Sequence, residues 1–342
     1  MNFSLSNLIT LIITVLGVPG SCSSFWERPL VHYHGSRVSM ASTYTIDLYG
    51  TDREMLPLVA EMAFNEVDRI DGLMSIYKRG SSVSFINRQA AKKPVVVGPE
   101  LFEFLQRCLS FSHESEGAFD ITILPLMRVW GFLDDEGRVP SVNELQKVLC
   151  KVGYQKLTLN SKQRTIEFEQ DGMSLDLGGI AKGYAVDRVV SLLKEYQIER
   201  ALVSAGGSTL FALGAPPREE AWRVKIRDPV SPRDPNKSAL TVRLKNQCLS
   251  VAGSYEQSFT IEGVTYSHVM DPRRGRPVDG VLSVAVVTES GLEGDALDNI
   301  LFVKGPKESK SYLMRYPTVQ AYFFLPALKS EWRMVNLSST SK

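Results

Sequence analysis

Apolar and polar residues alternate from Thr43 to Gly50, as expected for a strand with one buried face. The period then changes, and apolar residues recur three or four positions apart, which predicts amphipathic helices. Such helices are expected over 54–73, from Pro99 onward and over 182–196. Ser141 and Glu144 have the spacing of a capping box, which predicts the start of another helix.

The second half of the chain is rich in short β-type runs. Strands are expected over 201–204, 223–227, 239–244, 283–287 and 319–325, and a buried helix over 296–303. The proline-rich stretch 228–236 predicts a surface loop. Strands and helices mix without a βαβ rhythm, and no internal repeat is present. The sequence therefore predicts an α+β fold, a single mixed α/β domain, rather than a doubly wound sheet.

Composition excludes some classes of protein. The chain has 342 residues, 44% of them hydrophobic and 23% charged, with a formal net charge of +1. Those proportions are typical of a globular protein, and the lack of excess basic charge argues against a nucleic-acid binder. Cys108, Cys150 and Cys248 show no metal-binding spacing. Cys108 lies on the apolar face of an expected helix, so it is predicted to be buried packing.

The N-terminus has the features of an exported protein. The uncharged apolar run Leu8–Val18 is too short to span a bilayer and has the length of a signal-peptide core. Cys22 follows small residues, as in bacterial lipoproteins, although Pro19 and the lack of a preceding basic residue depart from that pattern. Cys22 is therefore either a lipidated N-terminus or a spectator thiol. The expected organisation is a signal peptide over 1–22, a tether over 23–39, a catalytic domain over 40–330 and a tail over 331–342.

Two segments carry groups that suit an anionic or aromatic ligand. From Ser174 to Asp187 an apolar strand leads through paired glycines to Lys182 and a helix, an arrangement that lets backbone N–H groups face a phosphate. A tight turn with a solvated lysine is the alternative. In 115–122, Phe119 and Asp120 could hold a ring and its polar edge, or could be a core residue and a cap.

Two further segments offer catalytic and metal-binding groups. His268 precedes the turn DPRRG and is a candidate acid–base group, with a structural role as the alternative. Asp295 and Asn299 are four residues apart, so both oxygen-bearing side chains share one helix face, as suits Mg²⁺. Asp295 as a helix N-cap is the competing interpretation.

Taken in this order, the four segments resemble the FAD:protein FMN transferase family, also known as the thiamine biosynthesis lipoprotein family. The resemblance runs from about Met40 to the last expected strand and includes SIYKRGSSVSFIN (75–87), LVSAGGSTLFALG (202–214) and WRVKIRDP (222–229). It implies an α+β domain whose two halves enclose a flavin cleft. It implies FAD contacts at Met40, Tyr77, Ala118, Phe119, Asp120, Asp176, Lys182, Asp187 and Val269, a Mg²⁺ site at Gly179, Asp295 and Asn299, and catalysis by His268 with Asp295.

The resemblance also implies an activity and partners. FMN would pass from FAD to a threonine or serine of a target protein, with AMP released and Mg²⁺ required. Targets would be subunits of membrane electron-transfer complexes such as sodium-pumping NADH:quinone oxidoreductase. The enzyme would meet them at the periplasmic face of the bacterial inner membrane, held there by a lipid anchor if Cys22 is acylated. An FAD pyrophosphatase and a non-catalytic flavin-binding lipoprotein are the alternatives.

This chain departs from the family pattern at several positions. Ala41 stands where the family usually has glycine, Ser208 where aspartate is frequent, and Asn299 where the metal-site threonine is expected. Val251 and Ala252 replace a Thr-Ser pair. An amide oxygen on Asn299 could still serve a cation, whereas the lost hydroxyls remove hydrogen bonds expected near the flavin or the phosphates.

Overall fold

The computed structural model describes residues 29–134, 136–328 and 331–338. Its centre is an eight-stranded sheet in the order β1-β2-β6-β7-β10-β15-β16-β17, in which every neighbouring pair is antiparallel. The strands are β1 (Val31–Ser39), β2 (Ser42–Gly50), β6 (Arg200–Ala205), β7 (Thr209–Leu213), β10 (Gln247–Gly253), β15 (Ser283–Thr288), β16 (Gln320–Pro326) and β17 (Trp332–Ser338). An antiparallel sheet with separate helices confirms the expected α+β class.

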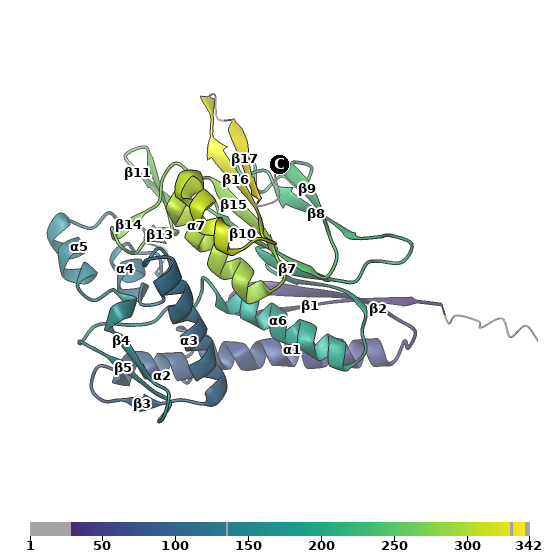
Figure 1. Cartoon of the computed structure of the whole chain (residues 1–342), viewed down its shortest axis with the longest axis horizontal. Coiled ribbons are helices and arrows are strands. Elements are labelled where there is room, and N and C mark those ends of the chain that lie inside the picture. The colour runs from purple at the N-terminus through teal and green to yellow at the C-terminus, as the bar shows by residue number, and fades with distance from the viewer. Residues whose placement is uncertain (1–28, 135, 329–330, 339–342) are drawn as a thin grey trace, which may run out of the picture.

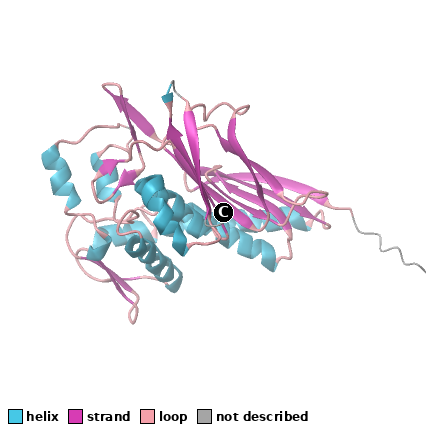
Figure 2. Ribbon diagram, turned by 45° about the horizontal axis from the view of Figure 1, so that its top comes forward, coloured by secondary structure: helices cyan, strands magenta, loops and turns pink. Residues whose placement is uncertain are grey.

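Three helices cover one face of the sheet (Figures 1 and 2). They are α1 (Met55–Met74), α6 (Ala181–Glu195) and α7 (Gly291–Tyr312). Because strand side chains alternate between faces, Cys248, Val284 and Val286 join the core under these helices, and Leu249, Ala285 and Val287 face the other way. The helices predicted over 54–73 and 182–196 are confirmed, and the helix expected over 296–303 is the middle of the longer α7.

A hairpin covers the opposite face. It consists of β8 (Trp222–Arg227) and β9 (Ser238–Leu244), joined by the loop expected at 228–236. Trp222, Val224 and Ile226 alternate with polar residues along β8 and form a second core with the outward side chains of the sheet. The middle of the sheet is thus buried on both faces, which explains why β15 is buried throughout although it is antiparallel.

A smaller half of the molecule lies beside the main sheet. Between α1 and α6 the chain forms helices and a three-stranded sheet in the order β3-β5-β4. The capping box of Ser141 and Glu144 is present at the start of α5, as predicted. The elements are α2 (Ser82–Gln89), β3 (Val95–Val96), α3 (Pro99–Glu114), α4 (Leu124–Val129), α5 (Val142–Leu149), the 3₁₀ turn η1 (Tyr154–Lys156), β4 (Leu157–Asn160) and β5 (Thr165–Phe168).

Two small hairpins and a final 3₁₀ turn complete the structure. The hairpins are β11 (Ser258–Ile261) with β12 (Val264–Ser267), and β13 (Met270–Asp271) with β14 (Arg276–Pro277); the 3₁₀ turn is η2 (Leu313–Arg315). Cys108 is fully buried on α3, as predicted. Among the described residues, no helix has the length and apolar character needed to cross a membrane.

Two boundaries expected from sequence are wrong. Residues 31–39 are not a tether but the edge strand β1, paired along its whole length with β2. Alternate residues of β1 such as Tyr33 and Gly35 lie against α1, so the strand has a half-buried face without a strongly apolar sequence. Most of the expected tail is β17, which pairs with β16 at the other edge. The signal peptide and Cys22 lie outside the described residues.

Candidate active site

A cavity of about 600 Å³ lies between the helix-covered face of the sheet and the smaller half. This volume is within the range typical of small-molecule sites. Segments far apart in sequence meet in its wall: the β1–β2 turn, the start of α6, the middle of α7 and the segment before β13. The predicted site residues that line it are Met40, Tyr77, Ala118, Phe119, Asp120, Asp176, Gly179, Lys182, His268, Val269, Asp295 and Asn299.

The starts of α6 and α7 meet at Gly183. The N–H of Gly183 donates to Oδ2 of Asp295 at 2.6 Å. A Cβ at this position would lie 2.0 Å from the carbonyl oxygen of Gly291, so the two helices approach this closely only because residue 183 is glycine. The contact places the beginning of α6, with Gly179 and Lys182, directly beside the acidic face of α7.

Asp295 is buried in the second turn of α7 and is not the helix N-cap, a role that Ser290 fills. Its Oδ1 accepts hydrogen bonds from the hydroxyls of Thr209 and Ser250. Thr209 and Ser250 reach it because their positions on β7 and β10 point to the helix-covered face. The hydroxyl of Ser250 also lies 2.7 Å from Oδ2 of Asp298.

Asp295 and Asp298 are therefore two buried carboxylates held by one serine. Burial raises the pKa of both groups, and the negative charge of Asp295 raises that of Asp298 further. Sequence reasoning missed Asp298, although its spacing of three from Asp295 and its apolar neighbours place it on the same buried helix face. Ser250 and Thr209 were missed as well, because nothing in their local sequence marks them as partners of α7.

Asn299 lies beside this pair and directs its amide nitrogen, not its oxygen, toward the neighbouring oxygens. Its Nδ2 faces three oxygens: the carbonyl of Gly179 at 3.1 Å, the carbonyl of Asp295 at 2.9 Å and Oδ1 of Asp298 at 2.9 Å. An amide nitrogen with two hydrogens satisfies such acceptors, whereas its oxygen would be repelled by them. The amide is therefore oriented by electrostatics.

His268 lies where the chain enters β13. Its Nδ1 is 3.1 Å from the carbonyl oxygen of Gln257. A carbonyl only accepts, so Nδ1 carries the proton and Nε2 presents a lone pair. Burial is the main cause of a lowered pKa, opposed by the bond to Gln257, and the positive charge of Lys182 lowers the pKa further. His268 is thus held as a neutral base on the cavity wall.

Lys78 lines the cavity but pairs with Asp71, which leaves Lys182 as the unpaired cation among the lining residues. In the described part of the chain the ammonium group of Lys182 forms no hydrogen bond or ion pair, and its charge is felt by Asp295, Asp298 and His268. It stands on the first turn of α6, where backbone N–H groups also favour an anion. This half-buried, unpartnered charge suits a phosphate ligand.

Asp120 combines the two roles that the sequence left open, a cavity residue and a cap. It lines the cavity, but Oδ1 accepts from the N–H and hydroxyl of Thr122, and Oδ2 accepts from the N–H of Tyr154. These bonds fix the loop that carries Ala118 and Phe119 into the cavity wall. Asp120 acts first as the anchor of that loop.

Asp187 is not among the residues that line the cavity, and its contact with FAD stays a prediction. Its carboxylate caps α7, accepting from the N–H groups of Gly291 and Leu292 and from the hydroxyl of Ser290. Asp187 lies in the second turn of α6, and its side chain points toward the start of α7. The first N–H groups of α7 have no partner within the helix and require an acceptor.

The β1–β2 turn brings backbone strain to the cavity edge. Met40 and Ala41 both have positive φ, 50° and 54°. This two-residue turn matches the right-handed twist of a hairpin, but it favours glycine or asparagine. The turn places Met40 at the cavity, where its sulfur accepts a hydrogen bond from Tyr44.

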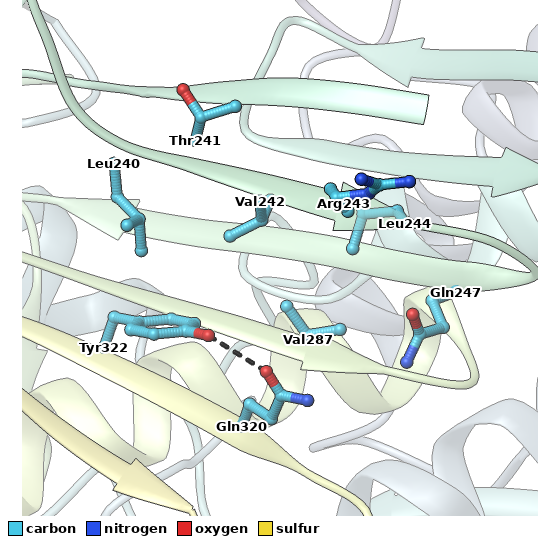
Figure 3. Close-up of a pocket in the computed structure, with 9 residues that line it drawn as sticks. All are labelled: Leu240, Thr241, Val242, Arg243, Leu244, Gln247, Val287, Gln320 and Tyr322. Carbon is cyan, nitrogen blue, oxygen red and sulfur yellow. Dashed lines mark hydrogen bonds between the residues drawn. The ribbon is translucent and has the colours of Figure 1, made fainter. Parts of the chain in front are cut away.

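A second, smaller cavity of about 190 Å³ lies between β9 and the outer face of the sheet (Figure 3). Tyr322 donates to Gln320 within it, and Arg243 is its only charged lining residue. It contains no base and no anionic group, so the chemistry of the protein belongs to the larger cavity. In the described residues no group of three or more His, Cys, Asp and Glu is placed to hold a metal ion. A cation in the large cavity would therefore depend on main-chain and amide oxygens beside the carboxylates.

The fold and the cavity together define a class of protein. A model of the ApbE family matches residues 40–323, most of the chain, and the chain belongs to the ApbE family. Two curated relatives are named FAD:protein FMN transferase. The one from Treponema pallidum is 32% identical over 280 residues, covering 78% of this chain and 76% of its own. The one from Escherichia coli K12 is 30% identical over 282 residues, covering 81% and 80%.

Solved structures agree with this assignment. The ApbE protein of Thermotoga maritima superposes with a TM-score of 0.81 at 26% identity, covering 91% of this chain and 98% of its own. The apo form of the flavinyl transferase ApbE of Pseudomonas stutzeri gives 0.79 at 26% identity, covering 92% and 98%. The resemblance inferred from sequence is confirmed.

Proposed function

We propose that this protein transfers FMN from FAD to a threonine or serine hydroxyl of another protein. The observation that carries the proposal is the pairing, on one cavity wall, of an oriented neutral base, His268, with an unpartnered cation, Lys182, at a helix start. Its relatives named FAD:protein FMN transferase support the same activity. Phosphoryl transfer needs positioning and charge neutralisation more than covalent catalysis, and this wall provides both.

In the reaction, the acceptor hydroxyl attacks the phosphorus that bears FMN. Nε2 of His268 takes the hydroxyl proton, because Nδ1 is already committed to Gln257. The P–O bond of the FAD pyrophosphate breaks, AMP leaves with the bonding electron pair, and a phosphoester joins FMN to the acceptor. Lys182 and the first N–H groups of α6 offset the negative charge of the phosphates.

We propose Mg²⁺ as the metal of this reaction. The oxygens around Asn299 Nδ2 fit a hard cation, since a partially positive N–H₂ group already occupies their centre. Gly179, Asp295 and Asn299 would hold the ion. When bound, it would supply positive charge that offsets the charge of the pyrophosphate and stabilises the transition state.

Export and membrane targets belong to the same proposal. The apolar run Leu8–Val18 supports a signal peptide, and Cys22 supports a lipid anchor at the periplasmic face of the inner membrane. Subunits of membrane electron-transfer complexes would then be within reach. Labelling of cells with a fatty-acid analogue tests the anchor, and equal labelling of wild type and Cys22→Ala would refute it.

Purified protein, FAD, Mg²⁺ and a candidate acceptor domain test the activity. Flavin fluorescence is followed on a denaturing gel while AMP is measured. Labelled acceptor with equimolar AMP supports the transferase. AMP and FMN without label indicate a pyrophosphatase, and no product with bound FAD indicates a binding protein; either result would refute the proposal.

A further inference from the structure

The cavity wall around Asn299 contains a second carboxylate, that of Asp298. Oδ1 of Asp298 and the carbonyls of Gly179 and Asp295 all lie 2.9 to 3.1 Å from Asn299 Nδ2. The amide has two hydrogens for these three acceptors. One nitrogen thus sits at the point on which an anionic oxygen and two carbonyl oxygens converge.

Asp298 is less fully engaged than Asp295. Three donors already fill the carboxylate of Asp295, from Thr209, Ser250 and the N–H of Gly183. At Asp298, Oδ2 shares the hydroxyl of Ser250, and Oδ1 accepts from the side-chain amide of the neighbouring Asn299. The hydroxyl of Ser250 has one hydrogen for two carboxylates, so it can donate to only one of them at a time.

We propose that Asp298 supplies a second carboxylate ligand to the cation, and that the Asn299 amide occupies the site until the cation displaces it. On binding, the amide rotates about its last side-chain bond and turns Oδ1 inward. The same residue thereby serves as a stand-in donor without the ion and as an oxygen ligand with it. This inference rests on the proposed function for the presence of a cation, and it assigns the ligands of that cation.

Removing the stand-in leaves three oxygens facing one another, which only a cation or a donor can stabilise. A divalent ion offsets the buried Asp295–Asp298 pair more completely than an amide does, and hard oxygens are the ligands it prefers. A threonine at position 299 could provide an oxygen but no N–H₂ group. In this chain the carboxylate of Asp298 and the amide of Asn299 therefore act together: the amide stabilises the carboxylate without the ion, and both groups bind the ion when it is present.

Mn²⁺ binding to the purified protein without FAD tests the proposal, with free Mn²⁺ measured by electron paramagnetic resonance. Asp298→Asn keeps the shape of the side chain and should weaken Mn²⁺ binding by about 10- to 100-fold or more. Asp298→Ser is the second variant, and circular dichroism and melting confirm that each is folded. Asp279→Asn, at an exposed position outside the cavity lining, is the matched control and should bind as wild type.

A second measurement follows the amide itself. The side-chain ¹H–¹⁵N signals of Asn299, assigned from their loss in Asn299→Thr, should shift on titration with diamagnetic Mg²⁺ and should not shift in Asp298→Asn. Wild-type Mn²⁺ binding that Asp298→Asn leaves unchanged would overturn this inference alone. Wild type that binds no Mn²⁺ would overturn both the inference and the metal in the proposed function. Flavin transfer to the acceptor is read separately on the gel.

Discussion

The N–H of Gly183 on α6 donates a 2.6 Å hydrogen bond to Oδ2 of Asp295 on α7. This bond joins the first turn of one helix to the acidic face of the other. It also explains why residue 183 has no side chain, since a Cβ would lie 2.0 Å from the carbonyl oxygen of Gly291.

Gly183→Ala should therefore destabilise the fold and disrupt the site together. Forced separation of α6 and α7 should cost about 1–3 kcal/mol in the free energy of unfolding, as overpacking generally does. Urea unfolding and FAD titration measure the two effects. Gly72→Ala is the control: this glycine lies in α1 with open space around its Cβ, so it should be neutral or stabilising. Equal stability of the two variants would contradict the proposed helix contact.

His268→Ala should reduce the rate of flavin transfer by about 10²- to 10⁴-fold, the usual contribution of a general base. FAD affinity should change much less, because the base acts on the acceptor hydroxyl. Single-turnover transfer and calorimetry separate the two. His34→Ala, on the exposed face of β1, is the matched control. Transfer that is unaffected in His268→Ala would assign the proton to another group.

The pH dependence should reflect the burial of His268. Burial lowers its pKa below the ordinary imidazole value of about 6.5, so the base form persists at lower pH. The acid limb of kcat/KM should lie below about pH 6.5. The unfolded chain takes up this proton more readily, so stability should be lost as pH falls from 6.5 toward the lowered pKa. A limb above pH 7 in the transfer assay would argue against His268.

Lys182→Met should weaken FAD binding by about 10- to 100-fold, since hydrogen bonds to charged groups contribute about 1.5–3 kcal/mol. The affinity should also become less dependent on salt. Wild type should prefer FAD to FMN, because only FAD supplies the adenylate half. Calorimetry at two ionic strengths measures this, with the exposed Lys92→Met as control. Unchanged FAD affinity in Lys182→Met would show that Lys182 does not bind the phosphates of FAD.

Asp187→Ala should lower stability without a specific loss of FAD affinity. Its carboxylate holds two N–H groups and a hydroxyl at the start of α7, and loss of a cap costs about 0.5–2 kcal/mol. Thermal melting and FAD titration below the melting temperature provide the test. Asp187→Asn, which keeps one acceptor oxygen, should lie between wild type and alanine. If a variant of normal stability bound FAD weakly, the result would support a direct contact between Asp187 and FAD.

Much of the fold could be predicted because its signals are local. The period of the apolar residues placed α1, α3 and α6, and the Ser141–Glu144 pair placed the start of α5. The site residues that the family-like segments predicted all line the cavity except Asp187. The edge strands β1 and β17 were missed because an edge strand is half exposed and lacks a strong apolar pattern.

The sequence by itself determined the class of fold, the resemblance to FAD:protein FMN transferases and the candidate roles of His268, Lys182 and Asp295. Only the tertiary structure decided the partners of each group. In the folded protein Asp187 caps α7, and the side-chain nitrogen of Asn299 faces three oxygens. Ser250 connects Asp298 to Asp295. The physical reason is that charges and hydrogen bonds act between neighbours in space, and β10 and α7 become neighbours only when the sheet and its helices pack together.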